Sequence, residues 1–288
     1  MGAQSEIVPL SLLPESCAVT IVDLRCAGHD TPGGHEEHPP AHEVVVPRRG
    51  AYLREVRGET GWVDAGTVTF AHPDEGYRVR HPVPGGDVCT VFSLSADAAR
   101  ELLGPDSRFP RAQAPLGGRA YLLHRLALGA ARQVSSQSAA GLAAEEYAAA
   151  FLGEVLTPGG SPRFPVGGRA PHHAMRARAF IARRYREPLS LAGIARASGC
   201  SVFHLSRQFV RSFGVPIWRY VVRLRLRDAL EQILETRDGL SRIGLGAGFA
   251  SQSHFGDAFR LEFGCAPGRV RRLPAPALAE LRERARIR

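Results

Sequence analysis

A degenerate internal repeat in the last third of the chain constrains the fold more than any other feature. Leu191, Ile194 and Gly199 recur 49 residues later as Leu240, Ile243 and Gly248. After one extra residue the shift becomes 50, and Ser201, His204, Phe209, Phe213 and Gly214 recur as Ser251, His254, Phe259, Phe263 and Gly264. Each copy predicts a short apolar helix, a glycine-containing turn and a second helix that begins at a serine. This layout predicts two helix-turn-helix units, because a solenoid needs about three or more copies to bury a core.

Charge is unevenly distributed along the 288 residues. Residues 1–160 carry 13 arginines and 19 acidic residues, a net charge of −6. Residues 161–288 carry 24 arginines and 9 acidic residues, a net charge of +15. A basic half beside an acidic half indicates a polyanionic partner for one domain, and the alternative is a solvated arginine surface.

The N-terminal half predicts a small β-sandwich or barrel. Short runs rich in Val, Thr, Phe and Tyr alternate with Gly/Pro/Asp turns, which predicts strands over residues 18–23, 43–47, 51–56, 66–70 and 89–94. Ser95 is suited to cap a short helix that runs to Leu103.

Two apolar helices are expected over residues 119–134 and 138–156, with a bend at Ser135–Ser138. Their apolar faces contain Leu122, Leu123, Leu126 and Val134 in the first helix and Leu142, Tyr147, Phe151, Leu152 and Val155 in the second. Such faces need a partner surface. Packing on the barrel and formation of a homodimer are both open, and the dimer is slightly favoured.

Composition also sets the expected domain boundaries. Residues 1–156 form the sensor domain, with a possible dimerisation segment at 119–156. Residues 157–171 hold four prolines and four glycines and read as a linker. Residues 172–273 form the helical domain, and residues 274–288 form a basic tail.

The cysteines and the N-terminus favour a cytoplasmic protein. The five cysteines form no CxxC pair, which argues for a reducing compartment. The first twenty residues lack a signal-peptide pattern, and no apolar run approaches membrane-spanning length. We therefore expect neither secretion nor a membrane partner.

Residues 172–273 resemble the DNA-binding domain of AraC/XylS-type transcription regulators. The most specific stretch is Gly248–Phe255 (GFASQSHF), followed by Phe259-Arg260, Phe263-Gly264 and Pro267, and residues 223–229 match the family's long connecting helix. The resemblance implies a sequence-specific regulator that binds double-stranded DNA and is not an enzyme. Activation, with RNA polymerase as a partner, is expected on family grounds.

One position departs from the family pattern. Ile243-Gly244 stands where the family has Ile-Ala, and Gly246 and Gly248 lie close by. Each glycine inside a helix costs roughly 0.5–1 kcal/mol relative to alanine. We therefore expect the second unit to be the looser of the two.

The second helix of each unit supplies the candidate base readers. Leu205, Phe209 and Phe213, and likewise Phe255, Phe259 and Phe263, recur at four-residue spacing and should face the core. The outward positions near the helix starts are then Phe203, Ser206, Arg207, Gln252, Ser253, His254 and Asp257. Arg207 suits guanine, Gln252 suits adenine and Asp257 suits cytosine. Alternatively, these residues contact only phosphates, or Asp257 pairs with a neighbouring arginine.

Other residues are better suited to phosphate. These candidates are Ser201, Arg211, Ser251 and Arg260. A helix from Pro216 to Glu235 would be about 30 Å long, close to the 34 Å of one turn of B-DNA. The chain is therefore expected to read two adjacent major grooves.

The N-terminal half resembles the cupin-type sensor barrel that many such regulators carry. His38, Glu43 and Gly50 echo the first cupin motif, and Gly66, Pro73, Gly76 and His81 echo the second. Glu36 stands where a paired histidine is usual. The two resemblances imply an α+β protein with a cupin-like barrel and an all-α DNA-binding domain.

The signal to which the sensor responds is open. A small organic effector without a cofactor is favoured, and Arg48, Arg49, Trp62, Tyr77 and Arg80 are candidates to hold it. Effector or metal ligands are expected among His38, His42, Glu43 and His81. Thiol sensing by Cys26 or Cys89 is a further possibility. A cupin-type metalloenzyme or metal sensor fused to a DNA-binding module, and an architectural DNA protein, are the alternative functions.

Overall fold

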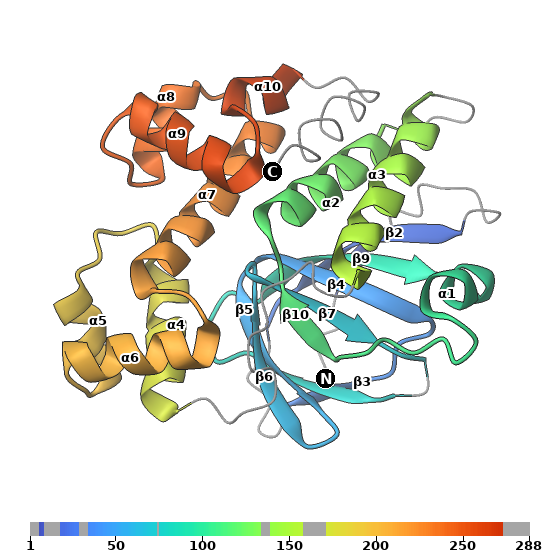
Figure 1. Ribbon diagram of the computed structural model, residues 1–288, viewed down its shortest axis with the longest axis horizontal. Helices are drawn as coiled ribbons and strands as arrows, with labels where there is room; N and C mark the ends of the chain where they lie inside the picture. The colour runs from blue at the N-terminus through green and yellow to red at the C-terminus, as the bar shows by residue number, and fades with distance from the viewer. Residues whose placement is uncertain are drawn as a thin grey trace.

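The computed structural model describes residues 6–8, 18–28, 34–73, 75–133, 139–157 and 171–272. Two regions lie side by side: a pair of β-sheets with three helices, and an all-helical region built around one long helix (Figure 1). This arrangement confirms the predicted α+β fold. His29, Val134, Ser135–Ser138, most of the expected linker and the expected tail lie outside the described residues.

The strands of the described residues form two antiparallel sheets. The six-stranded sheet has the order β1 (Glu6–Val8), β2 (Val19–Cys26), β9 (Asp87–Leu94), β4 (His42–Arg49), β7 (Thr67–Ala71) and β10 (Gln113–Pro115). The four-stranded sheet has the order β3 (His35–Glu37), β8 (Tyr77–Arg80), β5 (Ala51–Val56) and β6 (Glu59–Asp64). Their shared core contains Val45, Val91 and Cys89 from the first sheet and Tyr52, Val63 and Val79 from the second.

Three strands of the smaller sheet were not predicted from the sequence. β3 and β8 are short and rich in charged residues, so apolar patterning does not reveal them. β6 pairs with β5 across a turn in which Arg57 and Gly58 both have positive φ, 51° and 79°. Two such residues characterise the tight turn of a β-hairpin. The Arg-Gly dipeptide between two strand-like runs was therefore the available signal.

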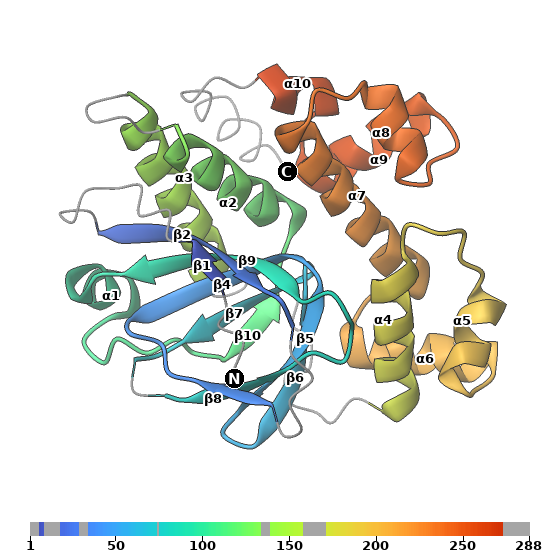
Figure 2. The same ribbon diagram turned by 180° about the vertical axis from the view of Figure 1, so that it is seen from behind.

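Three helices accompany the sheets. α1 (Ala96–Leu103) begins as predicted, because the Ser95 hydroxyl accepts a hydrogen bond from the Ala98 amide at 3.1 Å. α2 (Gly118–Ala131) and α3 (Ala139–Leu156) cover the outer face of the six-stranded sheet (Figures 1 and 2). The ring of Phe151 lies 4.7 Å from that of Phe92 on β9.

The apolar faces of α2 and α3 are used inside the chain. Leu122, Leu123, Leu126, Tyr147, Phe151, Leu152 and Val155 are all buried, whereas Leu142 is exposed. These faces thus find a partner surface within the chain, so their apolar character does not by itself call for a dimer, and the dimer stays a prediction.

The helical region contains seven helices in the described chain. They are α4 (His172–Arg184), α5 (Leu191–Ser198), α6 (Val202–Phe213), α7 (Ile217–Glu235), α8 (Leu240–Gly246), α9 (Gln252–Phe263) and α10 (Pro267–Arg272). α4, α5 and α6 gather at one end of α7, and α8, α9 and α10 gather at the other (Figure 1). None of the helices in the described ranges is both long and apolar enough to cross a membrane.

A buried polar cluster fastens the far end of α7 to the six-stranded sheet. Glu231 is fully buried, and its carboxylate receives the Tyr121 hydroxyl at 2.9 Å, Arg125 at 2.7 Å and Arg48 at 3.3 Å. Burial raises the pKa of Glu231, and the two arginines oppose that rise. Arg48 also pairs with Asp23 of β2. Arg48 is therefore part of the fastening and does not hold an effector.

A second cluster fastens the near end of α7 and α4 to the four-stranded sheet. One oxygen of Asp64 receives the Tyr220 hydroxyl at 2.5 Å, the Trp62 indole at 2.7 Å and Arg178 at 2.7 Å. Burial alone would raise the pKa of Asp64, but Arg178, Tyr220 and the Gly66 amide hold it below its usual value. Trp62, which is buried, thus supports this cluster and does not hold an effector.

Candidate nucleic-acid interface

The two helix-turn-helix units are built by the same local signals. Ser201 and Ser251 cap α6 and α9, and each hydroxyl accepts the amide three residues on, at 3.2 Å and 3.1 Å. Gly214 and Gly264 end these helices with φ of 65° and 77°, a conformation that favours glycine. These serines and glycines are the repeated residues of the sequence.

The packing faces agree with the four-residue spacing. Leu205 and Phe209 of α6, and Phe255 and Phe259 of α9, are fully buried, and Phe263 is nearly so. Phe213 is partly buried and packs 4.8 Å from the ring of Phe209. The opposite sides of α6 and α9 are therefore left toward solvent.

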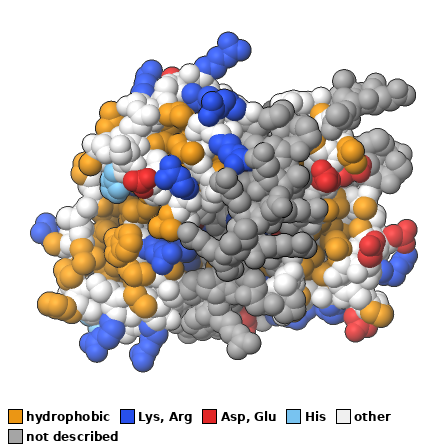
Figure 3. All heavy atoms as spheres, turned by 45° about the horizontal axis from the view of Figure 1, so that its top comes forward, with side chains coloured by type: hydrophobic (Ala, Val, Ile, Leu, Met, Phe, Trp, Pro, Cys, Tyr) orange, Lys and Arg blue, Asp and Glu red, His pale blue; other side chains and the backbone are white. Residues whose placement is uncertain are grey.

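The structure places the predicted base readers on these outer sides. Phe203 is 84% exposed, and a phenylalanine so placed is available to pack against a base. Arg207, Gln252, Ser253, His254 and Asp257 are exposed, and Ser206 is half-buried. In Figure 3 most arginine side chains in view lie over the helical region, and most acidic ones lie over the opposite side. The exposed helical surface is thus the basic side of this face.

The phosphate candidates are accessible as well. Ser201, Arg211, Ser251 and Arg260 are exposed. Arg260 forms an ion pair with Asp257 at 3.0 Å, with side chains 59% and 75% exposed. A pair so exposed contributes little energy, so DNA can displace it. The pairing of Asp257 with an arginine was one of the open alternatives.

Arg225 links the segment before α5 to the turn before α9, and it was not predicted from the sequence as a site residue. From α7 its guanidinium donates to the carbonyl oxygens of Tyr185 at 2.7 Å, Glu187 at 2.9 Å and Gly248 at 3.3 Å. The first two acceptors precede α5, and the third lies in the turn before α9. With 19 residues, α7 is about 28 Å long. The two units therefore sit at the two ends of a single rod.

The glycine at position 244 has a packing role. A Cβ added to Gly244 would lie 2.8 Å from Cγ of Phe255, which is fully buried. In the first unit the equivalent pair is Ala195 and Leu205, both buried. The larger ring of Phe255 in the second unit thus requires the smaller residue at position 244. Gly244 therefore marks a tightly packed point of the second unit.

The structure places His81 apart from the other three residues expected to hold an effector or metal. His38 is exposed and lies 3.6 Å from Glu36, and the His42 ring packs against His72 at 5.5 Å. His81 contacts Asp87, which begins β9. Glu43 pairs with Ser93 near the other end of β9, so His81 and Glu43 lie at opposite ends of the sheets.

Two of these four residues have shifted pKa values. Burial raises the pKa of Glu43 to about 7, against the opposing effect of the Ser93 hydroxyl. His81 hydrogen-bonds Asp87 at 2.5 Å, and this bond raises the pKa of His81 to about 10. Each residue therefore belongs to a separate local group.

One pocket of about 260 Å³ opens beside the turn between β5 and β6. Its lining includes Arg54, Arg57, His72, Phe109 and Arg111. Arg54 is committed to the carbonyl oxygens of Ala112 and Phe70, each at 3.0 Å. Nε of Arg111 is buried without a hydrogen-bond partner. The pocket thus offers a cation and an aromatic ring to a small molecule.

Comparison with known proteins agrees with the duplicated units. A family model described as a helix-turn-helix domain matches residues 194–273. The HTH-type transcriptional activator RhaS of Escherichia fergusonii is 24% identical over 249 residues, which cover 82% of this chain and 87% of that protein. RhaS of Salmonella schwarzengrund is 24% identical over 246 residues, with the same coverage.

Solved structures are similar as well. A transcriptional regulator from Chromobacterium violaceum with an AraC-type DNA-binding domain is 31% identical, covering 34% of this chain and 88% of its own, with a TM-score of 0.33. ToxT of Vibrio cholerae, in a structure with a bound unsaturated fatty acid, is 12% identical, covering 88% of this chain and 94% of its own, with a TM-score of 0.34. The helix-turn-helix match over residues 194–273 and the RhaS relatives, which span most of the chain, agree with the two duplicated helix-turn-helix units and support an AraC/XylS-type DNA-binding transcription regulator.

Proposed function

We propose that the protein activates transcription from sites that contain two short boxes about one helical turn apart. The observation that carries this proposal is the clamp of Arg225, which ties the segment before α5 and the turn before α9 to one rod, α7. The relatives are named transcriptional activators, which supports activation through contact with RNA polymerase. In this proposal residues 172–273 bind DNA, residues 157–171 link them to a sensor of residues 1–156, and residues 274–288 are a tail.

Base reading is assigned to the exposed side chains near the starts of α6 and α9. Phe203, Ser206 and Arg207 read one box, and Gln252, Ser253, His254 and Asp257 read the other. Ser201, Arg211, Ser251 and Arg260 contact phosphates. Their exposure and their position on the outer sides of the two helices support this division.

Selection of bound sequences from random duplex DNA by the full chain tests the geometry. We expect two conserved boxes with centres about 10 base pairs apart. Inserting half a turn between the boxes should then reduce affinity strongly, and inserting a full turn should not restore it, because α7 is rigid. Tight binding by a single box alone would contradict the proposal.

We further propose that a small carboxylate or other organic anion controls the protein from the pocket lined by Arg111. A buried guanidinium nitrogen without a partner supports an anionic ligand, and Phe109 offers an apolar wall. A thermal-shift screen of small carboxylates tests this, since a specific ligand raises the melting temperature by mass action. Arg111→Ala should abolish the shift, whereas Arg100→Ala on the exposed side of α1 should retain it. A shift that survives Arg111→Ala would contradict this assignment.

A further inference from the structure

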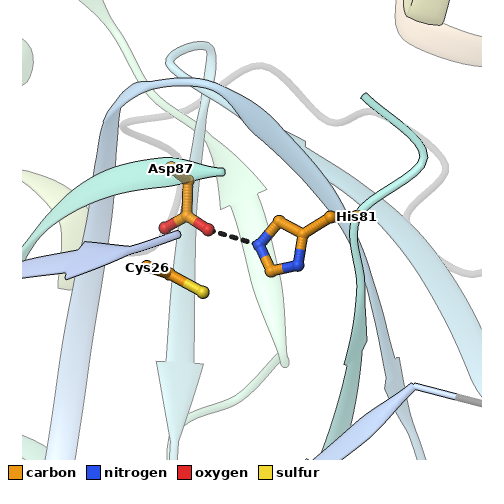
Figure 4. A group of neighbouring side chains, drawn as sticks. All are labelled: Cys26, His81 and Asp87. Atoms are coloured by element: carbon orange, nitrogen blue, oxygen red, sulfur yellow. Dashed lines mark hydrogen bonds and ion pairs between the residues drawn. The ribbon is translucent and has the colours of Figure 1, made fainter. Parts of the chain in front are cut away.

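Three side chains with metal-ligating atoms converge at one end of the sheet sandwich. Cys26 ends β2 and Asp87 begins β9, and the two residues lie directly opposite each other in the register of these strands. His81 follows β8 of the other sheet. The ligand atoms of the three residues all lie within 4.8 Å of one another (Figure 4). We propose that Cys26, His81 and Asp87 form a zinc site, separate from the pocket of Arg111 and independent of the proposed function.

The arrangement has the geometry of a metal site. Figure 4 shows the sulfur and the carboxylate on the same side of the imidazole ring, and Nε2 of His81 lies 2.5 Å from Oδ1 of Asp87. Zinc bonds of about 2.0–2.3 Å in a tetrahedron place ligand atoms about 3.3–3.7 Å apart. A zinc ion therefore requires only small side-chain movements, in which it takes the place of the hydrogen bond between His81 and Asp87.

The ligand types favour zinc over magnesium and calcium. A thiolate sulfur beside an imidazole nitrogen is unsuited to magnesium or calcium, which prefer oxygen ligands. Three protein ligands leave a fourth tetrahedral position for water or an exogenous ligand. A relay in which histidine links a carboxylate to a thiol through its two ring nitrogens does not fit, because both partners face one side of the ring.

Close backbone contacts hold the three ligands in place. Gly28, Gly50 and Gly86 all have positive φ, and their chains approach so closely that a Cβ has no room. A Cβ on Gly86 would lie 1.9 Å from the carbonyl oxygen of Cys26, and one on Gly50 would lie 2.1 Å from that of Gly86. The loop that carries Asp87 is thus pressed against the end of β2 that carries Cys26.

Neighbouring groups shield and orient the ligands. The side chains of His81 and Asp87 are only 7% and 5% exposed. The buried Cys89 thiol donates to Oδ2 of Asp87 at 3.0 Å, which leaves Oδ1 toward His81. Such outer partners fix the orientation of metal-bound carboxylates. The site is therefore enclosed and already oriented.

The loop between the ligands is packed on the DNA-binding region. Val83 is buried in an apolar cluster with Trp62 of β6, against which Met175 and Ala179 of α4 pack. The guanidinium of Arg183 on α4 also donates to the carbonyl oxygen of Pro82. Zinc that draws His81 and Asp87 toward Cys26 thus stiffens the surface on which α4 rests.

Zinc binding is measured on the full chain with any affinity tag removed. Protein stripped with a chelator is titrated with zinc in competition with a chromophoric chelator, and cobalt is used as a spectroscopic substitute. We expect one tight zinc per chain and a thiolate-to-cobalt charge-transfer band. Cys26→Ser, His81→Gln and Asp87→Asn should each weaken zinc binding by about 100-fold or more, because even outer partners are worth about 10–100-fold.

Matched controls keep the result interpretable. Cys200→Ser and His38→Gln should bind zinc as the unchanged protein does, and hydrogen exchange in α4 should slow when zinc binds. Thermal unfolding without zinc shows whether each variant folds, and its binding to selected DNA is measured separately. Absence of tight zinc in the unchanged protein, or undiminished binding by Cys26→Ser, overturns the site. Selective oxidation of Cys26 without zinc binding also overturns it, in favour of a thiol sensor.

Discussion

The two helix-turn-helix units share their caps and core spacing but differ in charge where they would meet DNA. Arg207 in α6 corresponds to Asp257 in α9, and Phe203 corresponds to Ser253. The first unit therefore presents a cation and an aromatic ring, and the second presents an anion and small polar groups. We therefore expect the first unit to be attracted to the polyanion more strongly than the second, while each unit reads its own box.

The units also differ in how they are fastened to the sheet region. The first is held through Asp64, which receives Arg178 of α4 and Tyr220 of α7. The second touches α2, where a Cβ on Gly118 would lie 2.1 Å from the carbonyl oxygen of Glu262. A charged anchor and a close backbone contact respond differently to mutation, which allows each unit to be loosened separately.

The largest expected effect comes from Asp64→Asn. It leaves the buried Arg178 without its carboxylate, which costs about 3–5 kcal/mol of unfolding free energy at neutral pH. Hydrogen exchange should rise in α4–α6 more than in α8–α9. Because the pKa of Asp64 is lowered in the fold, its stabilisation is present above the usual value of 3.8 and is lost as the pH falls below it. The difference between the two proteins should then shrink in acid.

A double variant separates this charge effect from general damage. Asp64→Asn/Arg178→Met removes both partners and should recover much of the stability, because replacing a whole buried pair by apolar groups is often neutral. An equal rise of hydrogen exchange in both units of Asp64→Asn would show that the two units are not fastened to the sheet region in different ways.

Gly244→Ala tests the packing difference inside the units. The new Cβ would press on Phe255, and overpacking of this kind costs about 1–3 kcal/mol. Gly244→Ala/Phe255→Leu reproduces the pair found in the first unit and should regain stability in chemical denaturation. If Gly244→Ala alone stabilises the protein, helix propensity outweighs packing at this position.

Arg207→Ala should weaken DNA binding by about 1–3 kcal/mol and relax base preference in one box. Fluorescence anisotropy with the selected site and with single-base variants of it measures both effects, and Arg100→Ala serves as the charge-matched control. An equal loss of affinity for all DNA sequences would show that Arg207 contacts phosphate and not a base.

Asp257→Ala should have the smallest effect, with the opposite sign on unrelated DNA. Loss of an exposed anion releases Arg260 and should strengthen nonspecific binding by less than about 1 kcal/mol, while preference at one base falls. The ratio of specific to nonspecific affinity, measured at fixed salt, reports both changes. A similar loss of affinity on every sequence would show that the two units do not differ as proposed.

The features that could be predicted from the sequence depend on residues close to one another along the chain. Ser201 and Ser251 capped their helices as expected, because a cap involves residues three apart. The predicted α+β fold was confirmed, and the comparisons support the predicted AraC/XylS resemblance. Strands such as Ala51–Val56 were found from their β-branched and aromatic residues, whereas Tyr77–Arg80 escaped because its side chains are mostly charged and polar.

Ion pairs between residues far apart in the chain could not be predicted from the sequence. Arg48 and Glu231 are 183 residues apart, and charge alone does not indicate which of many acidic residues an arginine meets. Part of the charge asymmetry attributed to DNA is used inside the chain, because Arg178 pairs with Asp64. Of the residues expected at an effector or metal site, His81 joined Cys26 and Asp87, a set visible only once β2 and β9 are paired.

The guanidinium of Arg225 engages only main-chain oxygens at its three acceptors. Main-chain oxygens are present whatever residues stand at positions 185 and 187. Substitutions at these positions should therefore leave the spacing of the two helix-turn-helix units unchanged. Under the proposed function, we expect substitutions at exposed residues of α6 and α9 to alter the preferred target while the interval between the two boxes stays unchanged. We then expect the promoters of such a regulator to vary in the base sequence of the two boxes but not in the spacing between them.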